Sequence, residues 1–376
     1  MIADTVPTGG LTLRPVGTDL HLPVRVAQNT TDGTELSLRT RMTHTMERAA
    51  DSIRFVYANW VNENGREAPG PSTITVSASV LTSDGAPIPA TFGGAPTARL
   101  APGQQVISDP VAVHALEESM ITSSTLVEVN RRGERIPLGS QLPGAAESYG
   151  FAPRLILSES GVGDDRLLVA VIGDSNAVGF GDDGTGTLHH GWVRRACEPD
   201  TAHLNLGISG ATARTSQSIS ALRHRFDLLR WVRPDRIISA LGTNDVADPT
   251  AHIDEVSRDL RAHWSALQSL GVPVVACTVP PVTSGSGEQH PVGAEPTRIA
   301  INRWIRSRPD PLLDVIDLAA ILEAPDRPGH WRTGFSDDGI HFSAQGHTEV
   351  ARVVRSFLES MRSPHTHQYD DRRQNR

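Results

Sequence analysis

One short stretch of the sequence limits the folds open to this chain more than any other. Residues 167–172 read Leu-Leu-Val-Ala-Val-Ile, an apolar run rich in β-branched residues that stops at Gly173. Such a run predicts a buried strand. Ser175 lies just beyond the stop, where a freshly turned backbone leaves its hydroxyl and the neighbouring N–H groups accessible. That placement suits a nucleophile, but Gly-Asp-Ser-Asn is also typical of an ordinary turn, so other parts of the chain must decide.

The second half of the chain alternates between strand and helix patterns. Strands are expected at residues 167–172, 203–208, 236–241, 273–279 and 312–318. Helices are expected between and after them at residues 192–198, 215–232, 251–270, 296–307 and 343–361. This order predicts an α/β fold, in which a five-stranded parallel sheet is covered by helices on both faces. Functional residues of such open sheets gather at the carboxyl ends of the strands.

Residues 1–150 show a different pattern of short alternating segments separated by turn residues. The clearest expected strands cover residues 36–42, 52–60 and 72–81. Several short strands with turns between them predict an all-β sandwich or jelly roll. Residues 139–153 are rich in Gly, Pro and Ser, so we expect a β domain at 1–150 and a catalytic domain at 151–363. The polar residues 364–376 are expected to form a disordered tail.

Composition and charge exclude several classes of partner. The formal net charge is -8 at pH 7, which argues against nucleic acid and anionic membrane surfaces. No apolar run approaches membrane-spanning length, and the first residues lack the basic and apolar regions of a signal peptide. We therefore expect a cytoplasmic protein as written, or a secreted one if a leader was removed. Neither the two cysteines, Cys197 and Cys277, nor the scattered His21, His44 and His114 predict a disulfide or a metal site.

The expected strand-end loops supply different chemical groups. His341 can take the proton of the Ser175 hydroxyl as general base and return it to a leaving alcohol. Asp338, three residues earlier, can fix the tautomer and orientation of that imidazole. The backbone N–H groups of Ser175 and Gly210 and the side-chain amide of Asn244 can stabilise an oxyanion. Each residue alone has an ordinary structural explanation, but their joint occurrence at four loops favours a catalytic site.

Together these loops resemble the sequence blocks of the SGNH subgroup of GDSL esterases and lipases. The matching segments are Gly173-Asp-Ser175, Asn205-Leu-Gly-Ile-Ser-Gly210, Gly242-Thr-Asn244-Asp245 and Asp338-Gly-Ile-His341. The resemblance covers roughly residues 166–361, with Asn176 standing where many members have Leu. The β-rich front half also resembles the jelly-roll-like domain that precedes some members.

This resemblance implies a three-layer α/β/α, flavodoxin-like catalytic domain that hydrolyses carboxylic esters through an acyl-enzyme, with neither a metal nor an organic cofactor. By the same resemblance, Ser175, Asp338 and His341 form the catalytic triad, and Ser175, Gly210 and Asn244 form the oxyanion hole. We expect small-molecule or carbohydrate esters with short acyl chains, such as acetyl groups, as substrates. Lipase-type or thioesterase-type hydrolysis is the alternative, and the sequence leaves the oligomeric state open.

Two further alternatives belong to other functional classes. Residues 179–184 satisfy the dinucleotide-binding pattern Gly-x-Gly-x-x-Gly, but they begin well past the strand end and do not open a helix. Asp182 and Asp183 in this segment are also candidate cation ligands. A non-catalytic carbohydrate-binding protein dominated by the β domain is the other alternative, against which the intact Ser175, Asp338 and His341 argue.

Overall fold

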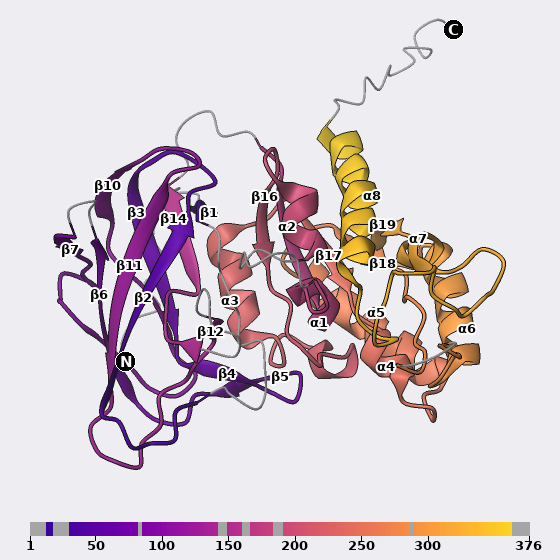
Figure 1. Cartoon of the computed structure of the whole chain (residues 1–376), viewed down its shortest axis with the longest axis horizontal. Coiled ribbons are helices and arrows are strands. Elements are labelled where there is room, and N and C mark those ends of the chain that lie inside the picture. Colours follow the sequence, from indigo (N-terminus) through magenta and orange to yellow (C-terminus); the bar gives the residue numbers. More distant parts are fainter. Residues whose placement is uncertain are drawn as a thin grey trace, which may run out of the picture.

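The computed structural model describes residues 13–17, 30–81, 85–141, 149–159, 166–182, 191–285 and 289–362. It contains a β-sandwich and an α/β region that lie side by side (Figure 1). The expected tail at 364–376 lies outside the described residues. None of the described helices is both long and apolar enough to cross a membrane.

The α/β region is built on one five-stranded parallel sheet, as the sequence predicts. Its strands lie in the order β16-β15-β17-β18-β19. Their bounds are β15 Leu168–Gly173, β16 Ala202–Asn205, β17 Arg236–Ala240, β18 Val274–Cys277 and β19 Leu312–Ile316. Numbered in chain order, the strands lie 2-1-3-4-5, which is the flavodoxin-like order. Because the strands are parallel, the carboxyl ends of the first three, β15, β16 and β17, lie at the same edge of the sheet.

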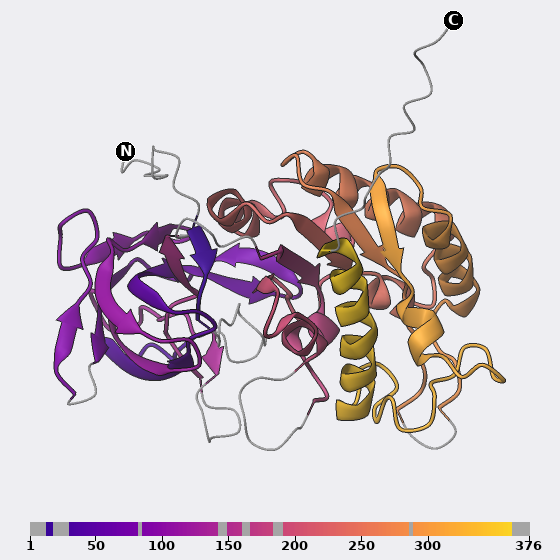
Figure 2. The same cartoon turned by 90° about the horizontal axis from the view of Figure 1, so that it is seen from above.

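Helices cover both faces of this sheet and make three layers (Figure 2). Ala170 and Ile172 of β15 pack in one core with side chains of α3, α5 and α6, whereas Val169 and Val171 pack in another with α2 and α8. The longer helices are α2 Trp192–Cys197, α3 Arg223–Val232, α5 Ile253–Gln268, α6 Glu295–Arg306 and α8 Ala344–Arg362. The shorter ones are α1 Ser175–Val178, α4 Thr243–Ala247 and α7 Leu318–Leu322. The expected three-layer α/β/α fold is thus confirmed.

The helix expected at 215–232 is shorter than predicted. A 3₁₀ turn, η2, covers Arg214–Ser216, and α3 begins only at Arg223, so that Ile219 is exposed rather than buried. Local side-chain hydrogen bonds explain the difference: the Thr215 hydroxyl accepts from the Thr212 N–H, and the Ser218 hydroxyl accepts from the Ala221 N–H. Such bonds offer the backbone an alternative to helix.

The front of the chain forms two antiparallel sheets that pack face to face. One holds β1 Leu13–Pro15, β3 Ala50–Ala58, β9 Gln105–Ile107, β10 Val111–Ala115 and β14 Leu155–Glu159. The other holds β2 Ser37–Thr45, β6 Ile74–Leu81, β7 Pro87–Pro89, β8 Ala98–Leu100 and β11 Met120–Glu128. The short pairs β4 Trp60–Glu63 with β5 Arg66–Pro69, and β12 Ser140–Gln141 with β13 Tyr149–Gly150, complete the region. This is the expected all-β sandwich.

In the sheet that contains β3 and β14, most of β14 and the second half of β3 are buried on both faces. Phe55 and Ile156 point into the core of the sandwich, whereas Val56, Leu155 and Leu157 join the core that contains α3 and α5. The apolar run of β14, without polar alternation, follows from this double burial. Because β14 lies beyond residue 150 yet pairs with β1 and β3, we propose that the β domain extends to Glu159 and that the boundary precedes β15.

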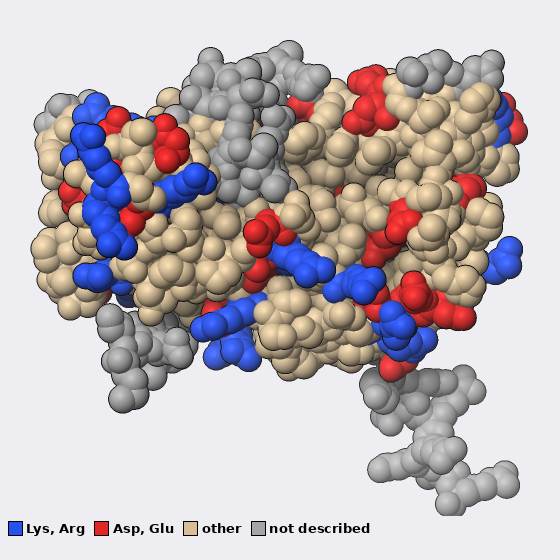
Figure 3. Space-filling model, turned by 90° about the horizontal axis from the view of Figure 1, so that it is seen from below, with Lys and Arg blue, Asp and Glu red and all other residues tan. Residues whose placement is uncertain are grey.

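Figure 3 shows that acidic and basic side chains lie close together on one face of the molecule. That no nucleic acid binds this chain stays a prediction from its net charge.

The shared core leads to a stability prediction. Leu157→Ala should lower the free energy of unfolding by about 2–5 kcal/mol, because Leu157 is fully buried between sheet and helices. The half-buried Leu126 of β11 is the control, and its replacement by alanine should cost distinctly less. Urea unfolding monitored by tryptophan fluorescence and by circular dichroism measures both. Equal effects of the two substitutions would contradict the shared core.

Candidate active site

Ser175 begins the short helix α1 directly after β15. Asp174 caps this helix: its Oδ1 atom accepts a hydrogen bond from the Asn176 N–H at 2.9 Å. Burial raises the pKa of the Asp174 carboxyl to about 6, against the opposing effect of that hydrogen bond. The serine side chain is thereby held at the carboxyl end of the first strand of the parallel sheet, as the sequence predicts.

The structure brings Ser175, His341 and Asp338 together. His341 Nε2 lies 2.9 Å from Ser175 Oγ, and His341 Nδ1 lies 2.6 Å from Asp338 Oδ2. An ionised carboxylate only accepts hydrogen bonds, so Nδ1 carries the proton and Nε2 faces the serine hydroxyl as an acceptor. This is the arrangement in which an imidazole can remove the hydroxyl proton.

Asp338 is held in its ionised form by the loop on which it lies. Partial burial raises the pKa of the Asp338 carboxyl. Hydrogen bonds from the His341 N–H, the His341 imidazole and the Ile340 N–H outweigh that effect and hold the pKa below its usual value. Asp338 therefore keeps its charge throughout the neutral range and fixes the orientation of the histidine.

Asn176 holds the backbone on both sides of His341, a contact that the sequence did not reveal. Its Nδ2 atom donates to the Ile340 carbonyl at 3.3 Å, and its Oδ1 atom accepts from the Phe342 N–H at 3.0 Å. The only signal in the sequence was a polar residue in place of the leucine found in many members of the resembled family. The side chain next to the serine thus positions the histidine.

Phe180 and His347 form a second support that the sequence did not reveal. The Phe180 ring lies against the His341 ring, with centroids 5.1 Å apart. His347 Nδ1 accepts from the Trp192 N–H, so its Nε2 atom carries the proton and donates to the Phe180 carbonyl at 2.9 Å. Burial lowers the pKa of His347 to about 4, and this imidazole is therefore neutral at physiological pH.

Gly210 lies on the loop that follows β16, and Asn244 lies in the first turn of α4, which follows β17. Gly210 has a φ of +79°, which favours glycine over residues with a side chain. Asn244 Nδ2 donates to the Ala211 carbonyl at 2.9 Å, and the Asp245 carboxylate accepts from the Ala213 N–H at 2.9 Å. An amide nitrogen carries two hydrogens, so Asn244 retains one for a ligand. These contacts fasten the Gly210 loop to the end of β17.

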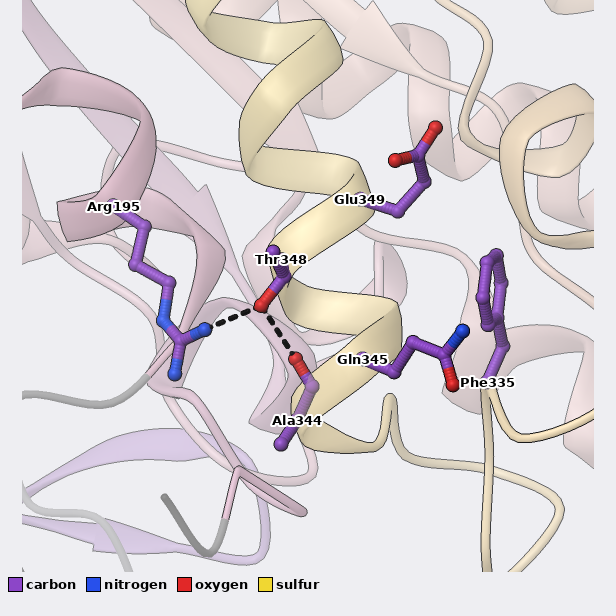
Figure 4. Close-up of a pocket in the computed structure, with 6 residues that line it drawn as sticks. All are labelled: Arg195, Phe335, Ala344, Gln345, Thr348 and Glu349. Atoms are coloured by element: carbon purple, nitrogen blue, oxygen red, sulfur yellow. Dashed lines mark hydrogen bonds between the residues drawn. The ribbon is translucent and has the colours of Figure 1, made fainter. Parts of the chain in front are cut away.

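A separate cavity of about 370 Å³ opens beside the first turns of α8 (Figure 4). Its lining residues are Arg195, Phe335, Ala344, Gln345, Thr348 and Glu349. None of the predicted site residues lines it. Its polar contacts include the hydrogen bond from the Arg195 guanidinium to the Thr348 hydroxyl.

The segment that begins at Gly179 does not have the geometry of a dinucleotide-binding loop or of a cation site where the structure describes it. Gly179 lies at the C-terminal end of α1 rather than at the start of a helix, unlike a dinucleotide-binding loop. The Asp182 carboxylate accepts from the Gly191 N–H and pairs with Arg195 at 2.7 Å, while Asp183 lies outside the described residues. Among the described residues, no group of three or more His, Cys, Asp or Glu side chains is arranged as a metal site.

A comparison with known protein families found a match. The model of the GDSL-like Lipase/Acylhydrolase family matches residues 171–348, which confirms the resemblance drawn from the four motifs. No curated protein matches the sequence.

Three solved structures illustrate the similarity. A structure described as a peptidoglycan O-acetylesterase is 14% identical, with a TM-score of 0.45, covering 93% of this chain and 77% of its own. A family two carbohydrate esterase from Clostridium thermocellum is 13% identical, with a TM-score of 0.40, covering 93% and 98%. A lipolytic protein of the G-D-S-L family from Desulfitobacterium hafniense DCB-2 is 20% identical, with a TM-score of 0.40, covering 50% and 98%.

The contacts of Asn176 lead to a testable prediction. Asn176→Ala removes both hydrogen bonds that flank His341, and displacement of a catalytic group by about 1 Å can cost about 100-fold in rate. We expect turnover of an ester substrate by the folded protein to fall by about 10- to 100-fold. The melting temperature should fall modestly, because two backbone groups beside His341 lose their partner. The exposed Asn130 of the β region supplies the matched control, Asn130→Ala. Wild-type turnover in Asn176→Ala would show that His341 needs no such support.

Proposed function

We propose that this chain, whose residues 171–348 match the GDSL-like lipase/acylhydrolase family, is a serine esterase that works through an acyl-enzyme. Ser175 is the nucleophile, His341 the general base and acid, and Asp338 the group that orients the imidazole. The observation that carries the proposal is the pair of contacts made by one imidazole, 2.9 Å to Ser175 Oγ and 2.6 Å to Asp338. The match to this family itself supports ester hydrolysis.

The acylation step follows from this geometry. As Ser175 Oγ forms a bond to the ester carbonyl carbon, its proton passes to His341 Nε2 and the carbonyl electron pair moves onto oxygen. The N–H groups of Ser175 and Gly210 and the Asn244 amide receive that oxyanion. When the bond to the alcohol oxygen breaks, His341 returns the proton to the leaving group, and Asp338 stabilises the transient imidazolium.

Deacylation repeats the sequence with water. His341 removes a proton from the water as its oxygen attacks the acyl carbon of the Ser175 ester. The carbon–Oγ bond then breaks, the acid leaves, and the proton returns to Ser175 Oγ. His341 and Ser175 carry out every proton transfer in these two steps, so the reaction as proposed needs no cofactor.

The proposed substrates are esters of short acyl chains, such as acetyl groups, on carbohydrate or another polar alcohol. What supports this choice is the polar turn of the β4–β5 pair, in which the exposed Asn64 lies next to Gly210. A polar rim favours an alcohol rich in hydroxyl groups over a hydrocarbon chain. Acylglycerols and thioesters are the alternatives for the experiment to test.

A panel of esters tests the proposal. p-Nitrophenyl esters from acetate to palmitate, together with an acetylated polysaccharide, should show the highest kcat/KM for the shortest acyl chain. Ser175→Ala should lose about 10³-fold or more in kcat while retaining its circular dichroism spectrum. A Ser175→Ala variant that keeps more than about a tenth of the wild-type kcat would overturn the assignment. Absence of hydrolysis by the folded wild type would favour the non-catalytic carbohydrate-binding alternative.

The two adjacent aspartates of the histidine loop supply a matched pair of substitutions. Asp338→Asn should depress kcat/KM by up to about 10⁴-fold, because an amide can favour the wrong imidazole tautomer. Asp337→Asn should have a mild effect, because the hydrogen bonds from His341 go to Asp338 and not to the equally exposed Asp337. The assay uses one ester at a mildly alkaline pH, at which a histidine base is neutral. If Asp337→Asn proves the more damaging change, the proposed triad is wrong.

A further inference from the structure

The hairpin formed by β4 and β5 reaches from the sandwich to the α/β region (Figure 1). Its two-residue turn consists of Asn64 and Gly65, whose φ angles of 52° and 77° are those of a type I′ turn. Asn62 reinforces this turn, because its Oδ1 atom accepts from the Gly65 N–H at 2.9 Å. The turn at the tip of the hairpin therefore has a well-defined conformation.

The tip lies directly against the loop that carries Gly210. Asn62 is 1% exposed, and its Nδ2 atom donates to the Ser209 carbonyl at 3.0 Å. A Cβ atom on Gly65 would lie 2.1 Å from the Gly210 carbonyl oxygen and 2.7 Å from the Ala211 nitrogen, so only glycine permits this approach. Two consecutive peptide units of the loop are thus held by the hairpin.

The hydrogen bond from Asn62 determines where the Gly210 N–H points. The Ser209 carbonyl and the Gly210 N–H belong to the same planar trans peptide unit, in which the C=O and N–H bonds point in opposite directions. A donor that holds the carbonyl on the hairpin side therefore directs the N–H to the other side. The same bond polarises the peptide unit and strengthens its N–H as a donor. Among the described residues, none accepts a hydrogen bond from the Gly210 N–H, which leaves it available to a substrate.

A buried ion pair fastens the base of the hairpin to the same loop. The Glu67 carboxylate of β5 accepts from Arg225 Nε at 2.7 Å and from the His224 N–H at 2.7 Å. Arg225 is fully buried, and its guanidinium also donates to the Leu206 carbonyl and, at 3.4 Å, to the Ser216 hydroxyl. The ion pair therefore links the hairpin to both ends of the segment that contains Gly210.

We propose that the β4–β5 hairpin positions the oxyanion hole, with Asn62 as the positioning residue that aims the Gly210 N–H at the substrate. The inference rests on the proposed function, in which that N–H receives the oxyanion. It gives the β domain a part in catalysis, because a segment far from the triad in sequence orients one of the three donors. The α/β region itself holds the loop through Asn244 and Asp245 on the side of β17 and through Arg225 at its two ends.

Asn62→Asp tests this positioning with almost no change in shape. The assay is run at a mildly alkaline pH to keep the new carboxylate ionised, because burial favours its neutral form. The ionised aspartate keeps an oxygen that accepts from the Gly65 N–H, but its second oxygen faces the Ser209 carbonyl and has no hydrogen to donate. Loss of an oxyanion donor costs about 10²–10³-fold in kcat, and a misdirected donor should lose part of that. We expect kcat to fall by about 10- to 100-fold with KM within about twofold, because the hydrogen bond from the Gly210 N–H to the oxyanion is made chiefly in the transition state.

Asn59→Asp is the matched control. Asn59 is equally buried, and its Nδ2 atom donates to the Ser72 and Leu100 carbonyls inside the β region, away from the loop. The chemical change is the same and any general destabilisation is similar, yet kcat of the folded fraction should stay within about twofold of the wild type. Should either aspartate variant fail to fold, Asn62→Ser and Asn59→Ser provide the comparison without an added charge.

A second readout does not depend on activity. Hydrogen exchange of the amides in residues 206–213 should be faster in Asn62→Asp than in the wild type, and unchanged in Asn59→Asp. Equal kcat losses in the two variants, or wild-type kcat and exchange in Asn62→Asp, would overturn the positioning role. A folded wild type that hydrolyses no ester would instead overturn the proposed function, and the exchange comparison would still decide whether the hairpin orders the loop.

Discussion

The 2.9 Å approach of His341 Nε2 to Ser175 Oγ is the contact around which the α/β region is arranged. It joins residues that are 166 positions apart, and neither lies on a long element. Three separate constraints maintain it: β15 delivers the serine, Asp338 turns the imidazole, and Asn176 holds the backbone around the histidine. A loop that carries a base is flexible by default, so such a contact needs support from both of its sides.

Burial and hydrogen bonding shift the pKa values of the carboxyl groups around this contact in opposite directions. Asp174 is buried, and this raises the pKa of its carboxyl, whereas Asp338 accepts several hydrogen bonds that hold its pKa below the usual value. His347 is buried and neutral, so it supports Phe180 without adding charge near His341. The imidazolium of the proposed acylation would thus face Asp338, whose low pKa keeps it ionised.

Much of the α/β region could be predicted from the sequence because its signals are local. The strand runs, the turn residues after each strand and the helical spacing of apolar residues each depend on a few neighbouring positions. The start of α3 was missed because Thr215 and Ser218 form local hydrogen bonds that compete with the helix. Residues 155–157 are all apolar, which indicates a strand buried on both faces. The pattern does not show that one face packs in the sandwich core and the other against the helices of the α/β region.

The supports of the proposed site depend on contacts between distant residues, and this is why sequence patterns do not show them. Residues 62–65 are recognisable as a turn, but that Asn62 binds the Ser209 carbonyl, 147 positions away, depends on how the two regions pack. The side-chain contacts of Asn176 likewise become visible only once the histidine loop lies over α1.

Covalent labelling tests the central claim, that Ser175 is a nucleophile activated by His341, most directly. The native protein is treated with a fluorophosphonate, which reacts with an activated serine, and the adduct is located by intact-mass measurement and peptide mapping. The account predicts one adduct per chain, on Ser175, that is absent from Ser175→Ala. A folded protein that acquires no adduct, or acquires it on another residue, would contradict the account.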